Sequence, residues 1–301
     1  GDVYKRQVSD AEALVVRSGT KVTADVIASA SRLRVIGRAG IGLDNVDIAA
    51  ASKRGIVVMN TPDGNVITTA EHTVAMLMAL SRNIHQATTS MKAGQWEKKR
   101  FLGQEVYHKT LGIIGVGRIG RIVAERAAGL RMHVIAYDPH LEPETIQKLG
   151  VVPVDLDELY QRSDYISVHT PLTRDTKGLL NHEAFAKMKE GVMIINCARG
   201  GIVNEQDLYE AITSGKVAGA ALDVFEQEPP GDHPLLKLGQ VICTPHLGAS
   251  TGEAQENVAV AIAEQIKEFL LAGGIRNAVN TPQISCELMS EICHYLTLAE
   301  R

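Results

Sequence analysis

The sequence TLGIIGVGRIGRIVAERAAGLRMHVIAYD, residues 110–138, decides the fold. It begins with an apolar run, passes through a glycine-rich turn into a helical pattern, and ends with a second apolar run and Asp138. The runs at 111–114 and 134–137 have the composition of strands buried on both faces of a parallel sheet. Residues 118–128, between them, have the length of the crossover helix that joins two such strands.

Three glycines in the turn match the pattern G-x-G-x-x-G: Gly115, Gly117 and Gly120. The first allows a tight bend, the second lets the backbone approach a pyrophosphate, and the third lets the helix pack on the strand. Free amide groups at the start of the helix can then bind phosphate oxygens. Asp138 follows Gly120 by 18 residues, near the spacing of an acid that binds a ribose diol. Since a carboxylate there repels a 2′-phosphate, we expect NAD rather than NADP as the cofactor; a plain tight turn is the alternative.

A strand–helix–strand rhythm, typical of parallel α/β layers, runs through the chain. Before the glycine-rich turn, strands are expected at 13–17, 33–37 and 56–59. From residue 110 onward, six apolar runs have the length of strands, which is the number that a dinucleotide-binding fold uses: 111–115, 134–137, 165–169, 192–196, 217–222 and 241–244.

A turn cluster at 60–64 marks a candidate domain boundary. A long helix is expected to follow it, with Val66, Ala70, Val74, Leu77 and Ser81 on one face. Residues 251–271 have the spacing of an amphipathic helix that could return to the first domain. We therefore expect two α/β domains, with these bounds: a discontinuous domain of residues 1–63 and 250–285, and a Rossmann-type domain of residues 64–249.

The composition is that of an ordinary globular protein. Apolar residues make up 45% of the 301 residues, which is enough chain for about two domains. A formal net charge of −4 gives no general attraction to nucleic acid or to anionic membranes, so we expect neither as a partner. The sequence has no membrane-length apolar run and no visible secretory signal, which predicts a cytoplasmic protein.

The sequence has four cysteines, Cys197, Cys243, Cys286 and Cys293. They form no C-x-x-C pair, so we expect reduced thiols rather than a disulfide, and no metal site.

Three further segments follow later strands, at the edge where α/β folds bind ligands. Arg199 follows the run at 192–196, and a guanidinium so placed can hold a carboxylate bidentately and polarise a carbonyl. Glu228 precedes two prolines, and His246 lies between an expected strand and an expected helix. A Glu–His pair raises the histidine pKa and suits it to proton exchange with a substrate. Arg199 and His246 each also have a structural interpretation, Arg199 as a surface arginine in a turn and His246 as an ordinary polar residue.

These motifs together resemble the D-isomer-specific 2-hydroxy acid dehydrogenase family, over residues 8–285. The resemblance rests first on five segments: GVGRIG at 115–120, YDP at 137–139, NCARGGIV at 196–203, ALDVFEQEP at 221–229 and PHLGAST at 245–251. Four more are similar to the branch that acts on a phosphorylated hydroxy acid: VRSGTKVTADVI at 16–27, GRAGIGLDNVD at 37–47, VMNTPDGN at 58–65 and ATTSMKAGQWEKKRF at 87–101.

The resemblance implies a Rossmann-type doubly wound parallel sheet and a second, discontinuous, flavodoxin-like substrate domain. It implies NAD-dependent oxidation of 3-phospho-D-glycerate to 3-phosphohydroxypyruvate, the first step of phosphorylated L-serine biosynthesis. Two alternatives stay open. One is a dehydrogenase of glyoxylate, hydroxypyruvate or another D-2-hydroxy acid, and the other is an NAD-sensing, co-repressor-like interaction protein.

The same resemblance assigns roles to residues of this sequence. It makes Arg199 the contact of the substrate carboxylate and carbonyl, and it makes Glu228 the partner that tunes His246, the acid/base. Cofactor contacts fall on these positions: Gly115, Gly117, Arg118, Ile119, Gly120, Asp138, Thr170, Cys197, Ala198, Asp223, Gly248 and Ala249. Arg17 and Arg38 become contacts of a phosphorylated hydroxy acid, which carries about three negative charges.

Several expectations concern assembly and the chain ends. The basic run at 98–100 either adds charge to the substrate site across a dimer or is a solvated face. By resemblance, residues 64–90 suit the interface of a homodimer or homotetramer. The family's first strand and helix are missing or replaced by residues 1–7, so we expect a truncated substrate domain with an open sheet edge. Residues 286–301 are expected to be the stub of a C-terminal regulatory region.

Overall fold

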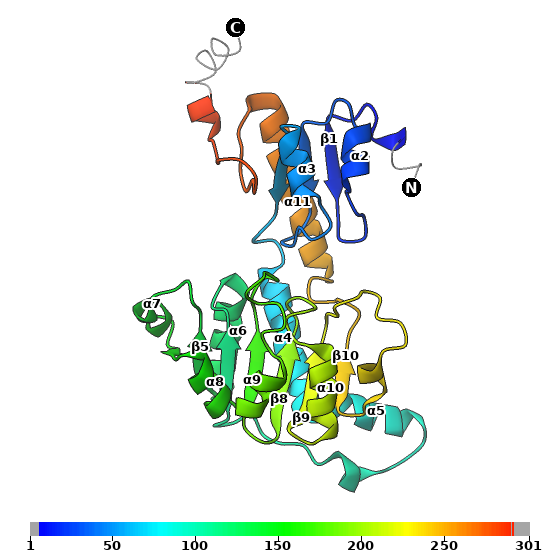
Figure 1. Cartoon of the computed structure of the whole chain (residues 1–301), viewed down its shortest axis with the longest axis vertical. Helices are drawn as coiled ribbons and strands as arrows, with labels where there is room; N and C mark the ends of the chain where they lie inside the picture. Colours follow the sequence, from blue (N-terminus) through cyan, green and yellow to red (C-terminus); the bar gives the residue numbers. More distant parts are fainter. Residues whose placement is uncertain (1–5, 290, 292–301) are drawn as a thin grey trace. The chain divides into compact units, whose positions relative to one another are not determined.

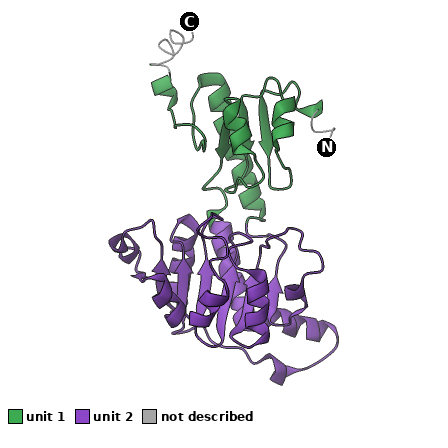
Figure 2. Cartoon of the chain, in the orientation of Figure 1, with its two compact units in different colours: residues 1–66, 249–301 green, residues 67–248 purple. Residues whose placement is uncertain are grey.

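The structure is a computed structural model that describes residues 6–289 and 291. The chain divides into two compact units (Figure 2). Unit 1 consists of residues 1–66 and 249–301, and unit 2 consists of residues 67–248. Most of the expected regulatory stub, residues 290 and 292–301, lies outside the described residues.

Among the described residues, unit 2 contains a sheet of seven parallel strands in the order β10-β9-β8-β7-β4-β5-β6 (Figure 1). The strands have these bounds: β4 (Thr110–Ile114), β5 (His133–Tyr137), β6 (Val152–Pro153), β7 (Tyr165–Val168), β8 (Val192–Asn196), β9 (Val217–Leu222) and β10 (Val241–Cys243). The chain builds from β4 to β6 and then returns to pair β7 with the other side of β4. This reversal is the topological switch point at which doubly wound sheets bind ligands.

The expected fold class, α/β with parallel sheets, is confirmed. Six of the strands in this sheet lie where apolar runs predicted them, within a residue or so at each end. The strand β6 was not predicted, because a two-residue strand that ends in proline leaves no recognisable apolar run.

The long helix expected after the turn cluster, with Val66 to Ser81 on one face, is confirmed as α4 (Val66–Ser81), and a separate helix, α5 (Ile84–Lys92), follows it. The amide of Gln104 donates to the carbonyl of Ser81 at 2.9 Å, so this carbonyl is paired with a distant segment rather than with an amide of a continuing helix. Asn83 then adopts a left-handed conformation with φ of +52°, which asparagine tolerates better than most residues. The other helices and 3-10 turns of unit 2 are η1 (Lys98–Phe101), α6 (Arg118–Gly129), α7 (Pro143–Gln147), α8 (Leu156–Arg162), α9 (His182–Lys187), α10 (Glu205–Thr213) and η2 (Pro234–Lys237).

The strands of unit 2 divide their side chains between two buried clusters. In β7, Tyr165 packs into one cluster and Ile166 into the other, and in β8 Ile195 and Ile194 divide in the same way. One cluster includes residues of α4 and α6, and the other includes residues of α8, α9 and α10. Because both sets of side chains are buried, the strands are apolar throughout rather than alternating, which is why they were recognisable as continuous runs.

Unit 1 contains, in its described part, a parallel sheet in the order β1-β2-β3. Its elements are β1 (Ala13–Val16), α2 (Ala24–Ser29), β2 (Val35–Arg38), α3 (Ile48–Lys53), β3 (Val57–Asn60) and α11 (Gly252–Ala272). Val258, Ile262 and Ile266 of α11 share one buried cluster with Val35 and Met59 of the sheet. The second segment of the chain therefore supplies part of the core of unit 1.

Three of the cysteines lie in the described part of the chain and are free thiols: Cys197, Cys243 and Cys286. Cys293 lies outside the described residues. None of the described helices has both the length and the apolarity of a membrane span. Within the same residues, no group of three or more His, Cys, Asp or Glu side chains is arranged as a metal site.

Candidate active site

Several of the predicted site residues gather at one edge of the sheet of unit 2. In a parallel sheet, the carboxyl ends of neighbouring strands share an edge. Gly115 directly follows β4, Asp138 follows β5, and Asp223 follows β9. Arg199 and His246 come shortly after the ends of β8 and β10. The sheet therefore brings together residues that are far apart in the sequence.

His246 and Glu228 form a hydrogen-bonded pair, here called the dyad. The distance from His246 Nδ1 to Glu228 Oε2 is 2.7 Å. The amide of Phe225 donates to Glu228 Oε1 at 3.2 Å, which orients the carboxylate. The His246 side chain is 45% exposed, so a bound molecule can reach it. Because Nδ1 is taken by the carboxylate, Nε2 is the ring nitrogen available for proton exchange.

The dyad shifts the pKa of both members. The hydrogen bond with Glu228 raises the pKa of His246, against the effects of burial and of the positive charge of Arg199. Burial would raise the pKa of Glu228, but the hydrogen bond and charge of His246 outweigh it, and the pKa is lowered. An ionised carboxylate thus holds a histidine whose protonated form is favoured.

Arg199 lies in the turn after β8, and this turn contacts the loop after β9 that carries Glu228. Asn196 Nδ2 donates to the carbonyl of Arg199 at 2.9 Å, which fixes the turn after β8. A Cβ at Gly200 would lie 1.9 Å from the carbonyl oxygen of Phe225, so only glycine lets the two loops approach so closely. The charge of Arg199 also acts on the pKa of His246. The guanidinium and the dyad therefore occupy one neighbourhood of unit 2.

Steric limits account for the glycines of the turn between β4 and α6. Gly115 has a φ of +93°, and a Cβ there would lie 2.9 Å from the carbonyl oxygen of His169. A Cβ at Gly120 would lie 2.1 Å from the carbonyl oxygen of Gly115, so another residue would push α6 away from β4. Gly117 has open space where a Cβ would stand. This opening at the N-terminus of the twelve-residue helix α6 leaves room for a phosphate.

Two side chains beside the turn fit a dinucleotide. Asp138 Oδ2 accepts the amide of Val116 at 2.8 Å, and its Oδ1 accepts the amide of His140 at 2.9 Å. The carboxylate is therefore oriented, and each oxygen keeps a lone pair for a ribose hydroxyl. Thr170 Oγ1 is buried and has no hydrogen-bond partner among the described residues, so a ligand could satisfy it.

Residues 74–248 match the family model described as D-isomer specific 2-hydroxyacid dehydrogenase, NAD binding domain. The chain belongs to this family. The resemblance and the NAD cofactor expected from the sequence are thereby confirmed.

Similar proteins include D-3-phosphoglycerate dehydrogenases of Methanocaldococcus jannaschii, 51% identical, and of Archaeoglobus fulgidus, 53% identical, each over 98% of this chain. The chain spans only 56% of the length of these relatives. A crystal structure of D-lactate dehydrogenase from Aquifex aeolicus, complexed with NAD and lactic acid, is 32% identical with a TM-score of 0.82. The match covers 93% of this chain and 90% of that one.

The remaining predicted cofactor residues of this family member differ in their surroundings. Arg118 and Ile119 are the first residues of α6, and Ala198 precedes Arg199 in the turn after β8. Cys197 is buried, and burial raises the pKa of its thiol to about 12, which makes it unreactive. Gly248 donates its amide to Asp223, whereas Ala249 is the first residue of the second segment of unit 1.

Arg17 and Arg38, the predicted substrate contacts, belong to unit 1. Arg38 ends β2 opposite Val16 of β1, and Arg17 follows Val16, so both arginines lie at the carboxyl edge of the small sheet. Arg17 is exposed, and Arg38 Nη1 donates to the carbonyl of Ala39 at 2.9 Å. The exposed basic run at 98–100 forms η1 and belongs to unit 2.

Sequence reasoning missed two residues of this neighbourhood, His72 and Thr244. The hydroxyl of Thr244 donates to Asp223, and His72 Nε2 lies 3.0 Å from that hydroxyl oxygen. His72 stands within α4, where nothing in the local sequence separates it from a surface histidine. Thr244 stood at the end of an expected strand, a position that could have drawn attention to it.

Proposed function

We propose that this family member oxidises 3-phospho-D-glycerate to 3-phosphohydroxypyruvate with NAD, the first step of phosphorylated L-serine biosynthesis. The observation that carries the proposal is the 2.7 Å hydrogen bond of the dyad, near Arg199 and at the sheet edge of the dinucleotide turn. The choice of substrate is supported by the curated relatives named D-3-phosphoglycerate dehydrogenase.

The chemistry divides among three side chains of unit 2. The guanidinium of Arg199 pairs with the substrate carboxylate and polarises the oxygen on C2. His246 Nε2 takes the proton of the C2 hydroxyl as the C2 hydrogen leaves with its electron pair. Bound NAD supplies the acceptor for that hydride. Glu228 holds Nδ1 and stabilises the imidazolium that forms, and the same histidine returns the proton when the reaction runs backwards.

The substitution Glu228→Gln is expected to shift the pH profile. The amide lacks the charge that raises the pKa of His246, so this pKa falls in the variant. Oxidation needs unprotonated His246 and increases as pH rises through its pKa, so the rising limb moves to lower pH. Reduction needs the protonated form, so its activity is lost at lower pH than in the wild type. The measurement is kcat/KM against pH in both directions, and unchanged profiles would contradict the assigned pair.

The substitutions Arg17→Ala and Arg38→Ala test the assignment of the phosphorylated substrate. A hydrogen bond to a charged group contributes enough that its loss raises KM for 3-phosphohydroxypyruvate roughly ten- to a hundredfold. We expect a much smaller change for unphosphorylated hydroxypyruvate. Arg32→Ala is the matched control, because Arg32 is an exposed arginine of unit 1 paired with Glu12. An unaltered preference between the two substrates would favour a dehydrogenase of glyoxylate or hydroxypyruvate.

We also propose that the chain forms a homodimer or homotetramer in the cytoplasm. The support is a set of exposed apolar side chains on α5 and after it: Ile84, Met91, Trp96 and Leu102. Ile84 and Met91 line one hollow on α5, and exposed apolar surface of this kind marks contacts between proteins. Sedimentation velocity is expected to show a dimer or tetramer that Met91→Glu dissociates, and a monomeric wild type would count against this proposal.

A further inference from the structure

Asp223 is a buried carboxylate on which the turn after β10 depends. Its side chain is 1% exposed. Oδ1 accepts the amide of Leu247 at 2.7 Å, and Oδ2 accepts the amide of Gly248 at 2.8 Å. Burial would raise the pKa of Asp223, but the surrounding donors outweigh it, so the pKa is lowered and the carboxylate stays ionised.

The backbone of His246 is held at the same point. Its amide donates to the carbonyl of Asp223 at 2.9 Å. His246 has a φ of +56°, in the left-handed region that residues other than glycine seldom adopt. Such a conformation persists only where its surroundings fix it. Asp223 therefore supplies three bonds to residues 246–248, and these bonds set the position of the acid/base histidine.

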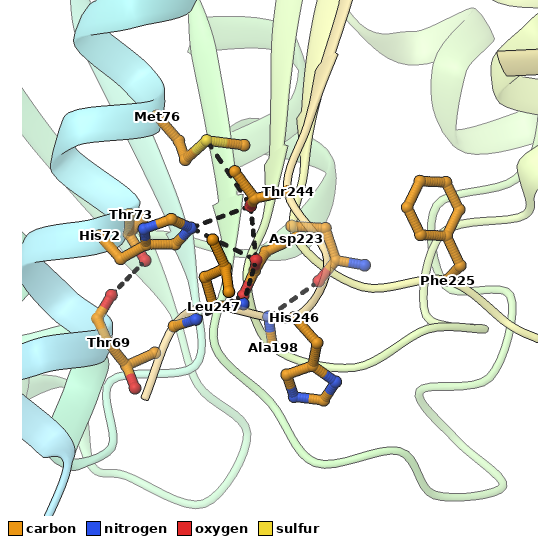
Figure 3. Close-up of polar contacts among 12 residues, drawn as sticks. Thr69, His72, Thr73, Met76, Ala198, Asp223, Phe225, Thr244, His246 and Leu247 are labelled. Atoms are coloured by element: carbon orange, nitrogen blue, oxygen red, sulfur yellow. Dashed lines mark hydrogen bonds and ion pairs between the residues drawn. The ribbon is translucent and has the colours of Figure 1, made fainter. Parts of the chain in front are cut away.

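Figure 3 shows His72, on α4, directed toward Thr244 and Asp223. His72 Nε2 lies 3.0 Å from Thr244 Oγ1 and 3.3 Å from Asp223 Oδ1. The hydroxyl of Thr244 donates its one hydrogen to Asp223 Oδ1, so it accepts from His72. His72 Nε2 therefore carries a hydrogen. The donors of His72 and Thr244 both face Asp223 Oδ1, the same oxygen that accepts the amide of Leu247.

We propose that His72 is a positioning residue for the reaction. Through Thr244 and Asp223, it fixes the turn that presents His246 to Glu228 and to the substrate. The expected effect of His72 on kcat rests on the proposed function, whereas its effect on the position of His246 concerns contacts within unit 2 alone. His72 and Thr244 are 172 residues apart in the sequence. A residue of α4 therefore stabilises the turn after β10, although α4 carries none of the three proposed catalytic residues.

The test uses two substitutions of similar size at this position. His72→Gln keeps an N–H donor near the place of Nε2, whereas His72→Met fills the same space without a donor. A misplacement of about 1 Å at a reacting group can cost roughly a hundredfold in rate. We expect His72→Met to lower kcat about tenfold or more, with KM for the 2-oxo acid within about threefold of wild type. His72→Gln should recover most of kcat, and His182→Met, at an exposed histidine of α9, is the control.

A second readout is independent of turnover. An NMR titration of His246 is expected to give a lower pKa in His72→Met, because the contact with Glu228 loosens, and the wild-type value in His72→Gln. The proposal is overturned if His72→Met keeps kcat within twofold and leaves the titration of His246 unchanged, or if His72→Gln is as impaired as His72→Met. Failure of the wild type to reduce 3-phosphohydroxypyruvate would contradict the proposed function, and the titration would then decide the role of His72 by itself.

Discussion

His246→Ala is expected to lower kcat roughly 10²–10⁴-fold, the usual contribution of a positioned acid/base group, while NADH binding stays within a few-fold of wild type. The two effects separate because the role proposed for His246 is exchange of the substrate proton, whereas the glycine-rich turn and Asp138 are the groups that fit the dinucleotide. Glu228 would then have no imidazole to orient, so its contribution to the rate would be lost together with that of His246.

The matched variant for this experiment is His246→Asn. Position 246 has a left-handed backbone with a φ of +56°, which asparagine adopts more readily than alanine. Both variants should lose kcat alike if proton exchange is the cause, even if alanine alone lowers the thermal midpoint. Stopped-flow binding of NADH and steady-state rates measure the two quantities. A variant of either kind that turns over at half the wild-type rate would show that His246 is not the acid/base.

Arg199→Ala is expected to lower kcat/KM roughly 10²–10³-fold, as removal of a preorganised donor does in other active sites. The turn that carries Arg199 should survive, because Asn196 holds its backbone through a bond to the main-chain carbonyl. The variant should also raise the pKa of His246, since the charge of Arg199 opposes that shift.

Arg199→Lys separates charge from geometry. Lysine keeps the positive charge but lacks the planar fork that binds a carboxylate through two parallel bonds, so we expect only partial recovery of kcat/KM. Rates with a series of 2-oxo acids give the measurement. Full wild-type activity in Arg199→Lys would mean that a point charge suffices, and full activity in Arg199→Ala would remove Arg199 from the mechanism.

Much of unit 2 could be predicted because its local signals agree with its fold. The strands around the glycine-rich turn are buried on both faces, so they appear as apolar runs that end where the candidate site residues begin. Gly115 and Gly120 are required by close backbone contacts, and those contacts are what the spacing of the motif encodes. Arg199, Glu228 and His246 could be selected as candidates because each stands beside a strand end or a proline pair, and the structure places them in one neighbourhood.

The features that could not be predicted depend on contacts between distant segments. The break between α4 and α5 follows from a bond between Ser81 and Gln104, which no helical periodicity reveals. His72 contacts Thr244 and Asp223 only because the sheet places β9 and β10 next to α4. A histidine on a helix carries no local sign of such a partner.

The most direct test of the proposed activity compares NADH-dependent reduction of 3-phosphohydroxypyruvate and of hydroxypyruvate by the wild-type chain, followed by nicotinamide absorbance. We expect kcat/KM to be about tenfold or more higher for the phosphorylated substrate, because the proposed contacts with Arg17 and Arg38 would add charged hydrogen bonds to it. Equal or reversed preference would contradict the assigned substrate. Binding of NADH without turnover of either compound would contradict the claim that Arg199 and the dyad form a working active site.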